Sequence, residues 1–333
     1  MRILHAPDDT AGQASFLAKQ QRLLGYDSTS LRYIDNYIDY PTDKSLHLDL
    51  RKSNDFVKSA RILSAFFNNL NYDVYHLHSN TLIPIVNADI PILKVLNKKV
   101  LINLHGTEAR LKYMAVRNNP YIKDIMEDID CKVNRYLWWC SRFFDTACVG
   151  DYELYEYAKK YFPKVEIIPR LVDYNNIQPN YPISKSSKLN IVHAPTNRKI
   201  KGTGYILKAM ENLGSKANLT LIENLNNRDA LKEIEQADIY IDQLILGTFG
   251  VSSLEAMAFG KPVIAYIRED LVPKYPNLPI INANPDNLEK VLKNILSERD
   301  NLAEIGRMGR EYVMRYHNIE SIVQKYFQVY ERL

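Results

Sequence analysis

The chain has 333 residues, of which 46% are hydrophobic and 25% charged, with a formal net charge of +4. This composition excludes a disordered or fibrous protein, and at roughly 100 to 200 residues per domain the length predicts two domains. The small basic excess is scattered, so it does not indicate nucleic acid as a partner, although it suits a diphosphate ligand or an anionic membrane surface.

The chain begins with a segment, Met1 to Pro7, that predicts a first strand rather than a signal peptide. No apolar run reaches the roughly 18 to 20 residues that cross a bilayer, so we expect a cytoplasmic protein. The spacing of Cys131, Cys140 and Cys148 fits neither a disulfide framework nor a zinc site, and we interpret them as buried or incidental thiols.

Short apolar segments alternate with amphipathic ones along both halves, which predicts an α/β fold with parallel sheets. The first series has strands expected near 3–6, 28–33, 74–78, 100–105 and 146–149, and helices near 13–24, 55–69, 122–143 and 152–161. The second series has strands expected at 189–193, 219–222, 239–242 and 262–266, and ends in helices.

The stretch from Asn175 to Lys188 is rich in proline, asparagine and serine without periodicity, and is predicted to link the domains. We therefore expect one Rossmann-like domain over 1–170, a second over 171–318, and a central cleft between them. The last segment, 319–333, has apolar residues at helical spacing. It is expected either to pack on its own domain or to cross back over the first.

The segment from Gly247 to Ile264 follows a predicted strand and combines a glycine-rich turn with the start of a helix. Glycines permit close backbone approach, and the amides of the first helical turn can receive a phosphate. Glu255 would lie near that turn, where its carboxylate can accept hydrogen bonds from ribose hydroxyls. The alternative from local physics alone is a capped helix with a stabilising acid at its positive end.

This segment resembles the retaining glycosyltransferases of family four, which have the GT-B fold with two facing Rossmann-like domains. The family signature has two glutamates eight positions apart, and Glu255 to Val263 match its second half. The resemblance implies that Glu255 holds the ribose of a nucleotide sugar. The first glutamate, which contacts the transferred sugar in the family, is replaced here by Gly247.

The departure at Gly247 leaves two alternatives. Either the sugar is held by the backbone amides of the loop, from Gly250 through Val251 and Ser252 to Ser253, together with Asp242 or Gln243, or the protein has lost activity. We favour the first alternative, because the rest of the phosphate site matches the family.

A basic loop, Arg198 to Lys201, follows the first predicted strand of the second domain. The carboxyl ends of parallel strands face the ligand, and fixed cations can stabilise a departing diphosphate without a metal. Arg198 and Lys201 resemble the paired arginine and lysine of the family, although their spacing is shorter. Lys199 is an alternative to either.

The first domain carries His105-Gly106-Thr107-Glu108 after a predicted buried strand. The resemblance places this histidine near the donor sugar, so His105 and Glu108 are candidates for holding the sugar or the acceptor hydroxyl. His78 ends another strand and is a weaker candidate.

Two further positions match family segments. Gly12, after the first strand, resembles the family's glycine-containing turn that lies against the donor phosphates or the acceptor. Arg170 stands where the family usually has asparagine, and would either add a cation to the phosphate site or pair with a surface acid.

From Arg110 to Phe144 the sequence reads as long helical material with basic residues ahead of aromatic ones. An apolar face buried in the core is the favoured interpretation. Peripheral membrane contact, with a lipid-linked acceptor, stays open.

The sequence therefore predicts a retaining, metal-independent hexosyltransferase that needs no cofactor and moves a sugar from a nucleotide diphosphate sugar to a glycan, glycolipid or lipid-linked acceptor. The resemblance implies surface polysaccharide or glycolipid synthesis, in the cytoplasm or at the inner face of the membrane. The alternatives are a noncatalytic nucleotide-binding or scaffold subunit and a nucleotide-sugar epimerase. The base, the sugar, the acceptor and the oligomeric state are not indicated.

Overall fold

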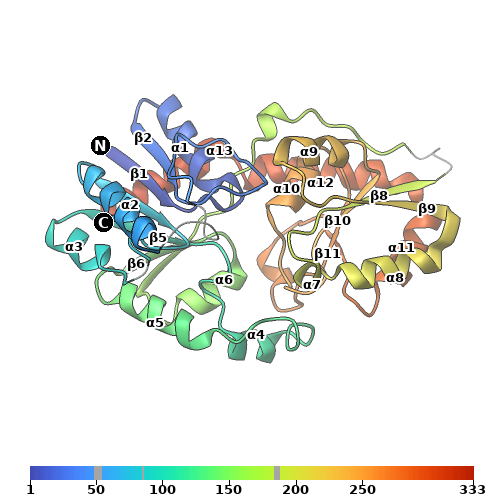
Figure 1. Ribbon diagram of the computed structural model, residues 1–333. Helices are drawn as coiled ribbons and strands as arrows, with labels where there is room; N and C mark the ends of the chain where they lie inside the picture. Colours follow the sequence, from blue (N-terminus) through green and yellow to red (C-terminus); the bar gives the residue numbers. More distant parts are fainter. Residues whose placement is uncertain (49–54, 85, 184–187) are drawn as a thin grey trace. The chain divides into compact units, whose positions relative to one another are not determined.

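The computed structural model describes residues 1–48, 55–84, 86–183 and 188–333, and they form two compact units (Figure 1). The first unit contains Met1–Leu111, Ile129–Leu171 and Ile319–Leu333, and the second contains Lys112–Asp128 and Val172–Asn318. The segment 112–128 thus groups with the second unit although it lies within the predicted first domain. Part of the predicted linker, 184–187, falls outside the described residues.

The first unit is built on a seven-stranded parallel sheet with the order β3-β2-β1-β4-β5-β6-β7. The strands are β1 (Arg2–Pro7), β2 (Asp27–Arg32), β3 (Lys44–Ser45), β4 (Val74–His78), β5 (Lys99–Leu104), β6 (Thr146–Val149) and β7 (Lys164–Ile167). The α-helices are α1 (Gln13–Leu23), α2 (Asp55–Asn68), α3 (Asp89–Val95), α5 (Asp130–Ser141), α6 (Tyr152–Ala158) and α13 (Ile319–Arg332).

The second unit has a five-stranded parallel sheet with the order β12-β11-β10-β8-β9. Its strands are β8 (Leu189–His193), β9 (Ala217–Leu221), β10 (Ile239–Ile241), β11 (Val263–Ala265) and β12 (Ile281–Asn282). The α-helices are α4 (Lys112–Asn118), α7 (Arg198–Lys201), α8 (Thr203–Leu213), α9 (Asn227–Glu235), α10 (Val251–Ala258), α11 (Leu288–Ser297) and α12 (Leu302–Tyr316).

Each sheet has a point where its strand order reverses. In the first sheet this switch point lies between β1 and β4, and in the second it lies between β8 and β10. Ligands of open α/β sheets bind outside the carboxyl ends of the strands at such points. The loops that follow these four strands are therefore the first places to look for a site.

The apolar strands form as predicted because both faces of each sheet are covered. β4 and β10 are buried along their whole length, including the polar side chains of His76 and His78. Helix α10 is also largely buried, because α12 packs against it through Gly309, where an added Cβ would lie 3.1 Å from Cγ of Met257. This packing holds the N-terminus of α10 in place.

The helix predicted over 122–143 forms only in its later part, as α5. Its first part is wrong, because turns and bends run from 119 to 129 between α4 and α5. Asn119 precedes Pro120, which disfavours helical backbone at Asn119. The side chain of Asn119 donates a hydrogen bond to the carbonyl oxygen of Ile245, at 2.6 Å, and the hydroxyl of Tyr121 donates to Asp286, at 2.7 Å. Contacts in the second unit thus replace the helix.

The C-terminal helix α13 packs in the first unit. The ring of Phe327 stacks on Tyr26 with the ring centroids 4.0 Å apart, and Asn103 donates to the hydroxyl of Tyr326 at 2.9 Å. The hydroxyl of Tyr330 lies 2.7 Å from Nδ1 of His76. The apolar stripe expected at 319–333 therefore covers strands of the first sheet.

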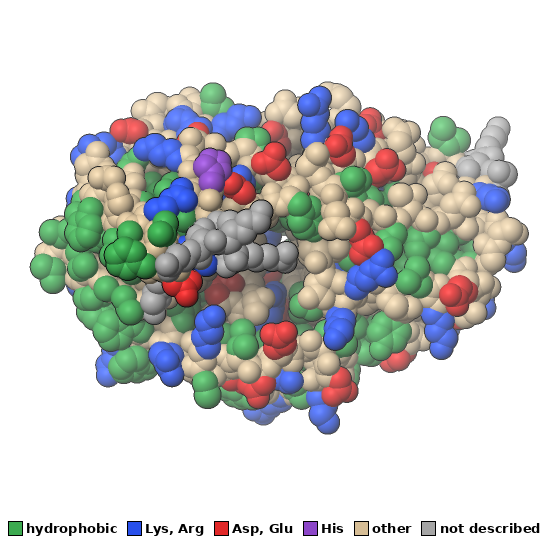
Figure 2. Space-filling model, in the orientation of Figure 1, with side chains coloured by type: hydrophobic (Ala, Val, Ile, Leu, Met, Phe, Trp, Pro, Cys, Tyr) green, Lys and Arg blue, Asp and Glu red, His purple; other side chains and the backbone are tan. Residues whose placement is uncertain are grey.

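None of the described helices combines the length and the hydropathy needed to span a bilayer. Of the segment from Arg110 to Phe144, the side chains of Leu137 and Cys140 are buried, whereas that of Trp138 is 50% exposed. Figure 2 shows apolar side chains gathered at left over α2 and α3, where Phe56 is 79% exposed and Val95 is 84% exposed. Cys148 is buried and Cys131 is exposed.

Candidate functional site

The second switch point is occupied by an ion pair. Asp242 directly follows β10 and is fully buried, and its carboxylate accepts from the ammonium group of Lys201 at the end of α7. Burial alone would raise the pKa of Asp242, but the charge of Lys201 and hydrogen bonds from Ser253 and Gly250 hold it below its usual value. The pair therefore keeps a fixed cation at the carboxyl ends of β8 and β10.

The start of α10 closes around the same carboxylate. Asp242 accepts hydrogen bonds from the amide of Gly250 at 3.1 Å and from the hydroxyls of Ser252 and Ser253 at 3.3 and 2.6 Å. A Cβ added at Gly250 would lie 3.7 Å from Nζ of Lys201, so the cation lies beside this helix N-terminus. Val251, the first residue of α10, is half-buried. Lysine, serine hydroxyls and amides in this arrangement can receive a phosphate.

Glu255 lies one turn further along α10 and is 9% exposed. Its carboxylate accepts a 3.1 Å hydrogen bond from the side-chain amide of Asn227, the first residue of α9. Burial, with a smaller contribution from the charge of Asp242, raises the pKa of Glu255 to about 7. The sequence interpretation missed Asn227, although an Asn-Asn pair opening a helix after a strand was the available signal.

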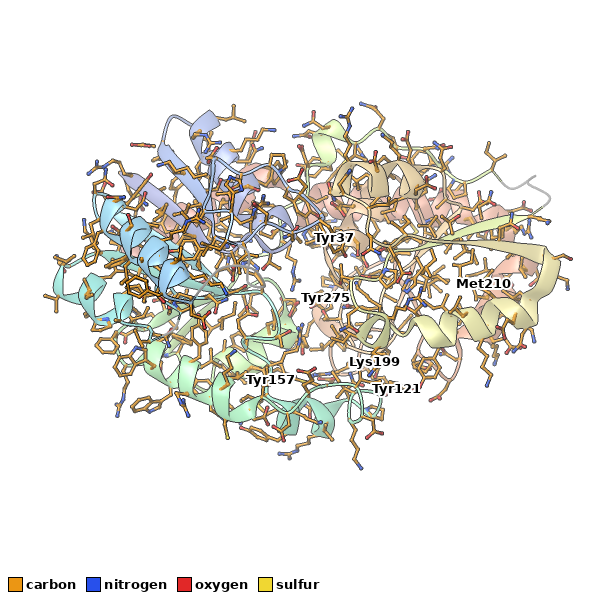
Figure 3. All side chains as sticks on the ribbon, in the orientation of Figure 1. Tyr37, Tyr121, Tyr157, Lys199, Met210 and Tyr275 are labelled. Atoms are coloured by element: carbon orange, nitrogen blue, oxygen red, sulfur yellow. The ribbon has the colours of Figure 1, made fainter. Side chains whose placement is uncertain are left out.

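The basic loop does not act as one cluster. Arg198 forms a two-point ion pair with Glu223, with N–O distances of 2.8 and 2.5 Å, and its side chain is 56% exposed. Lys199, labelled in Figure 3 on α7, is exposed. The structure thus brings Lys201 to Asp242, while Arg198 is held by an acid that the sequence interpretation did not single out.

Gln243 and His193 stabilise this region from within. The side chain of Gln243 is buried and donates a hydrogen bond of 2.5 Å to the carbonyl oxygen of Thr248, so it braces the loop before α10. His193 ends β8, and its two ring nitrogens lie 2.8 Å from the carbonyl oxygen of Ile241 and 2.9 Å from the hydroxyl of Thr203. Both ring nitrogens of His193 are therefore engaged, whereas the side-chain oxygen of Gln243 takes no part in its bond to Thr248.

In the first unit, His105 follows β5 and is supported on two sides. Its Nε2 atom lies 2.9 Å from Nδ1 of His78. The carboxylate of Glu108 accepts from the amides of His105 and of Gly106, the latter at 3.0 Å. Burial, with a smaller effect of the charge of Arg170, lowers the pKa of His105 to about 3. Glu108 thus shapes the turn that presents a neutral His105.

Gly12 and Arg170 are engaged within the first unit. Gly12 has φ of +70°, and a Cβ added there would lie 2.5 Å from the ring of Tyr40, so this ring covers the glycine. The guanidinium of Arg170 donates to the buried carboxylate of Asp151 at 2.6 Å. Of the two roles predicted for Arg170, the structure contains the pairing with an acid, although this acid is buried rather than superficial.

Comparison with protein families gives a match for the second unit. Residues 199–312 match the family described as glycosyl transferases group 1. This is about a third of the chain and includes α10 and all of α7 except its first residue, Arg198. The resemblance predicted from Glu255 to Val263 is confirmed at the level of this family. A search of curated proteins found no match.

Solved structures match along nearly the whole chain. Anabaena HepE in complex with UDP-glucose has a TM-score of 0.70 at 13% identity, over 99% of each chain. Sucrose-phosphate synthase from Thermosynechococcus elongatus has a TM-score of 0.68 at 15% identity, over 99% of this chain and 98% of that one. A UDP-N-acetylglucosamine 2-epimerase has a TM-score of 0.60 at 13% identity, over 100% of this chain and 97% of that one. These likenesses confirm the predicted α/β GT-B fold.

Gly247, which stands where the resemblance would place the first glutamate, lies in the segment that matches the group 1 glycosyl transferases. The side chain of Arg268 occupies the space that a side chain at 247 would need. Gly247 has φ of +80°, and a Cβ added there would lie 2.3 Å from Cγ of Arg268. Arg268 is 1% exposed, and its guanidinium donates to Asp270 at 2.7 and 3.0 Å. The glycine is therefore required by the packing of Arg268.

Proposed function

We propose that this chain is a glycosyltransferase that binds a nucleotide diphosphate sugar at the switch point of its second unit. The observation that carries the proposal is the contact of Lys201 and Asp242 at the N-terminus of α10, inside the segment matched by the group 1 family. A lysine and a helix N-terminus at the carboxyl ends of parallel strands suit a diphosphate. Glu255 would accept the ribose hydroxyls.

Catalysis would rest on charge stabilisation. When the sugar leaves, negative charge develops on the diphosphate, and Lys201 would stabilise it from a fixed position. Arg198 would join it if the diphosphate displaced Glu223. We extend the proposal to a reaction with retention and without a metal ion, and to His105 as a contact of the sugar or of the acceptor hydroxyl.

The groups that we propose to hold the transferred sugar differ from those of the family that the sequence resembles, in which a glutamate contacts the sugar. With Gly247 covered by Arg268, and with the amide of Gly250 and the carboxylate of Asp242 bonded to each other, we assign the hydroxyls of the sugar to the amides of Val251, Ser252 and Ser253, together with the side-chain oxygen of Gln243. The likeness to a structure with UDP-glucose makes UDP-sugars the first donors to test. Surface polysaccharide or glycolipid acceptors remain part of the proposal.

Calorimetry tests the donor site. We expect UDP-glucose, or one of the GDP-, ADP- and CDP-sugars, to bind equally with and without EDTA. Lys201→Met and Glu255→Ala should each weaken binding at least tenfold, whereas the exposed Lys208→Met on α8 should not change it. Lys199→Met tests whether the neighbouring lysine, rather than Lys201, binds the diphosphate. If no nucleotide sugar binds, or if Lys201→Met binds normally, the proposed site is wrong.

Turnover separates the alternatives. Release of nucleoside diphosphate with a glycosylated product of unchanged anomeric configuration supports the transferase. The likeness to an epimerase keeps that enzyme as the second candidate. It would convert the donor sugar without an acceptor, which NMR of the donor detects. Binding without either conversion, across a panel of glycan and lipid-linked acceptors, would favour the noncatalytic subunit.

A further inference from the structure

A row of buried histidines crosses the first switch point. His5 on β1 and His76 and His78 on β4 are fully buried, and His105 follows β5. Nδ1 of His5 lies 3.1 Å from Nε2 of His78, and Nδ1 of His78 lies 2.9 Å from Nε2 of His105. The His78 and His105 rings are inclined by only 7°. The row therefore runs from the interior of the sheet to the loop that carries His105, the proposed contact of the sugar or of the acceptor hydroxyl.

The end of this row is anchored by Gln21 on α1. Its amide oxygen lies 2.8 Å from Nε2 of His5 and accepts a 2.7 Å hydrogen bond from the hydroxyl of Ser28. Its amide nitrogen donates to the hydroxyl of Tyr330 at 3.3 Å. Because an amide oxygen only accepts, the proton of neutral His5 lies on Nε2.

The tautomer that Gln21 sets at His5 determines the tautomers of His78 and His105 in turn. Each neutral imidazole has one donor and one acceptor nitrogen, so a proton on Nε2 of His5 leaves Nδ1 to accept from Nε2 of His78. His78 in turn accepts on Nδ1 from Nε2 of His105. Burial lowers the pKa of His5 to about 4 and keeps that of His78 well below its usual value, so the rings stay neutral.

We propose that Gln21, His5 and His78 are positioning residues that fix His105 with its proton on Nε2 and its lone pair on Nδ1. His105 is then a hydrogen-bond acceptor for a hydroxyl group and does not act as an acid. This inference rests on the proposed function only in taking that hydroxyl to belong to the sugar or the acceptor. Glu108 holds the backbone of His105 separately, through the amides of the turn.

A metal ion is the competing explanation of the cluster, since His5, His76 and His78 each offer a nitrogen within 4.8 Å of the others. The hydrogen bonds disfavour it. Nδ1 of His5 and Nε2 of His78 already share a proton. The hydroxyl of Tyr330 accepts from Gln21 and has its own proton to donate to Nδ1 of His76, and in that arrangement Nε2 of His76 is the protonated nitrogen. That atom is buried without a hydrogen-bond partner among the described residues, and a protonated nitrogen is no ligand.

Nitrogen NMR of the full chain labelled with ¹⁵N-histidine tests the proposal directly. We expect His105 to be the Nε2–H tautomer from pH 6 to 8 in the wild-type protein. Gln21→Met should give a mixture of tautomers at His105, whereas the neighbouring Gln20→Met, on the same helix, should not. A His105 protonated on Nδ1, an unchanged tautomer in Gln21→Met, or a stoichiometric transition metal found by elemental analysis would overturn the proposal.

Kinetics add a measurement that a merely structural role would not move. In Gln21→Met we expect kcat for transfer to fall by roughly 10- to 100-fold, the effect of misplacing a reacting group by about 1 Å, with unchanged affinity for the nucleoside diphosphate alone. A normal kcat in Gln21→Met, together with mixed tautomers at His105, would overturn the positioning role of Gln21, His5 and His78. If the wild-type protein transfers no sugar, the proposed function fails, while the wild-type NMR spectrum still decides the tautomer.

Discussion

The two switch points occupy the same place in their sheets but contain opposite chemistry. In the first unit, neutral imidazoles of His5 and His78 bond to each other, so this row of rings carries no charge. In the second, Lys201 and Asp242 form an ion pair beside a helix N-terminus. The difference follows from burial, because a buried group without a counter-charge stays neutral whereas a paired one stays ionised.

The two switch points are therefore suited to different roles. A neutral, hydrogen-bonded row can orient one ring but offers little to an anion. An ion pair at a helix N-terminus holds a cation that a diphosphate can share. The comparison therefore supports the anion-binding role proposed for the second unit, and the predictions below test it there in order of expected size.

Breaking the ion pair should have the largest effect. Asp242→Asn leaves Lys201 nearly buried without its partner, and we expect the free energy of unfolding to fall by about 3 to 5 kcal/mol. Urea denaturation measures it. The double variant Asp242→Asn/Lys201→Met should regain part of the loss, because it removes the uncompensated charge. Equal losses in the single and double variants would show that the pair is not the source of the effect.

Filling Gly247 should have the next largest effect. Gly247→Ala adds a Cβ against the buried Arg268 and forces alanine to φ of +80°, so we expect a loss of about 2 to 4 kcal/mol in stability. Gly25→Ala is the matched control, since Gly25 has φ of +85° with nothing within 4 Å of an added Cβ. A control as unstable as Gly247→Ala would assign the whole loss to the backbone.

The smallest predicted effect depends on pH. The folded protein holds a proton on Glu255 up to about pH 7, whereas the ordinary pKa is 4.5. Binding this proton stabilises the folded state, and the stabilisation is lost as the pH rises from 4.5 to 7. Glu255→Gln mimics the neutral acid, and should match the wild type near pH 4 but exceed its stability at pH 8. At about 1.4 kcal/mol per pKa unit the gain is at most roughly 3 kcal/mol.

Melting temperatures of both proteins from pH 4 to 8 measure this effect without any ligand. Asp229→Asn is a suitable control, because Asp229 is an exposed helix acid whose pKa is lowered by Lys232 and Asn226 rather than raised. A stability difference between Glu255→Gln and wild type that does not grow with pH would show that Glu255 is ionised throughout.

The fold was largely predictable because its signals are local. The strands at 74–78, 146–149 and 189–193 form with the predicted bounds, since apolar runs in parallel sheets are buried on both faces. The first part of the helix predicted over 122–143 does not form, and the preceding Asn119 and Tyr121 make contacts with residues more than 100 positions away. Periodicity carries no information about such contacts.

The sequence indicated candidate residues of the site but not the side chains with which they pair. Family-like motifs indicated Lys201, Glu255 and His105. The partners Glu223, Asn227 and Gln21 come from other elements and match no motif, so only the structure reveals them. The alternation of His76 and His78 was visible, yet it gave no hint of the direction of their hydrogen bonds.

The contact between Gly247 and Arg268 makes the two positions interdependent during sequence change. A glutamate at 247 would collide with the buried stem of Arg268, whereas shortening Arg268 first would open that space and release Asp270 from its ion pair. A path towards the two-glutamate signature that alters residue 268 before residue 247 therefore avoids this collision. The order of the steps, and not only their number, separates this chain from that signature.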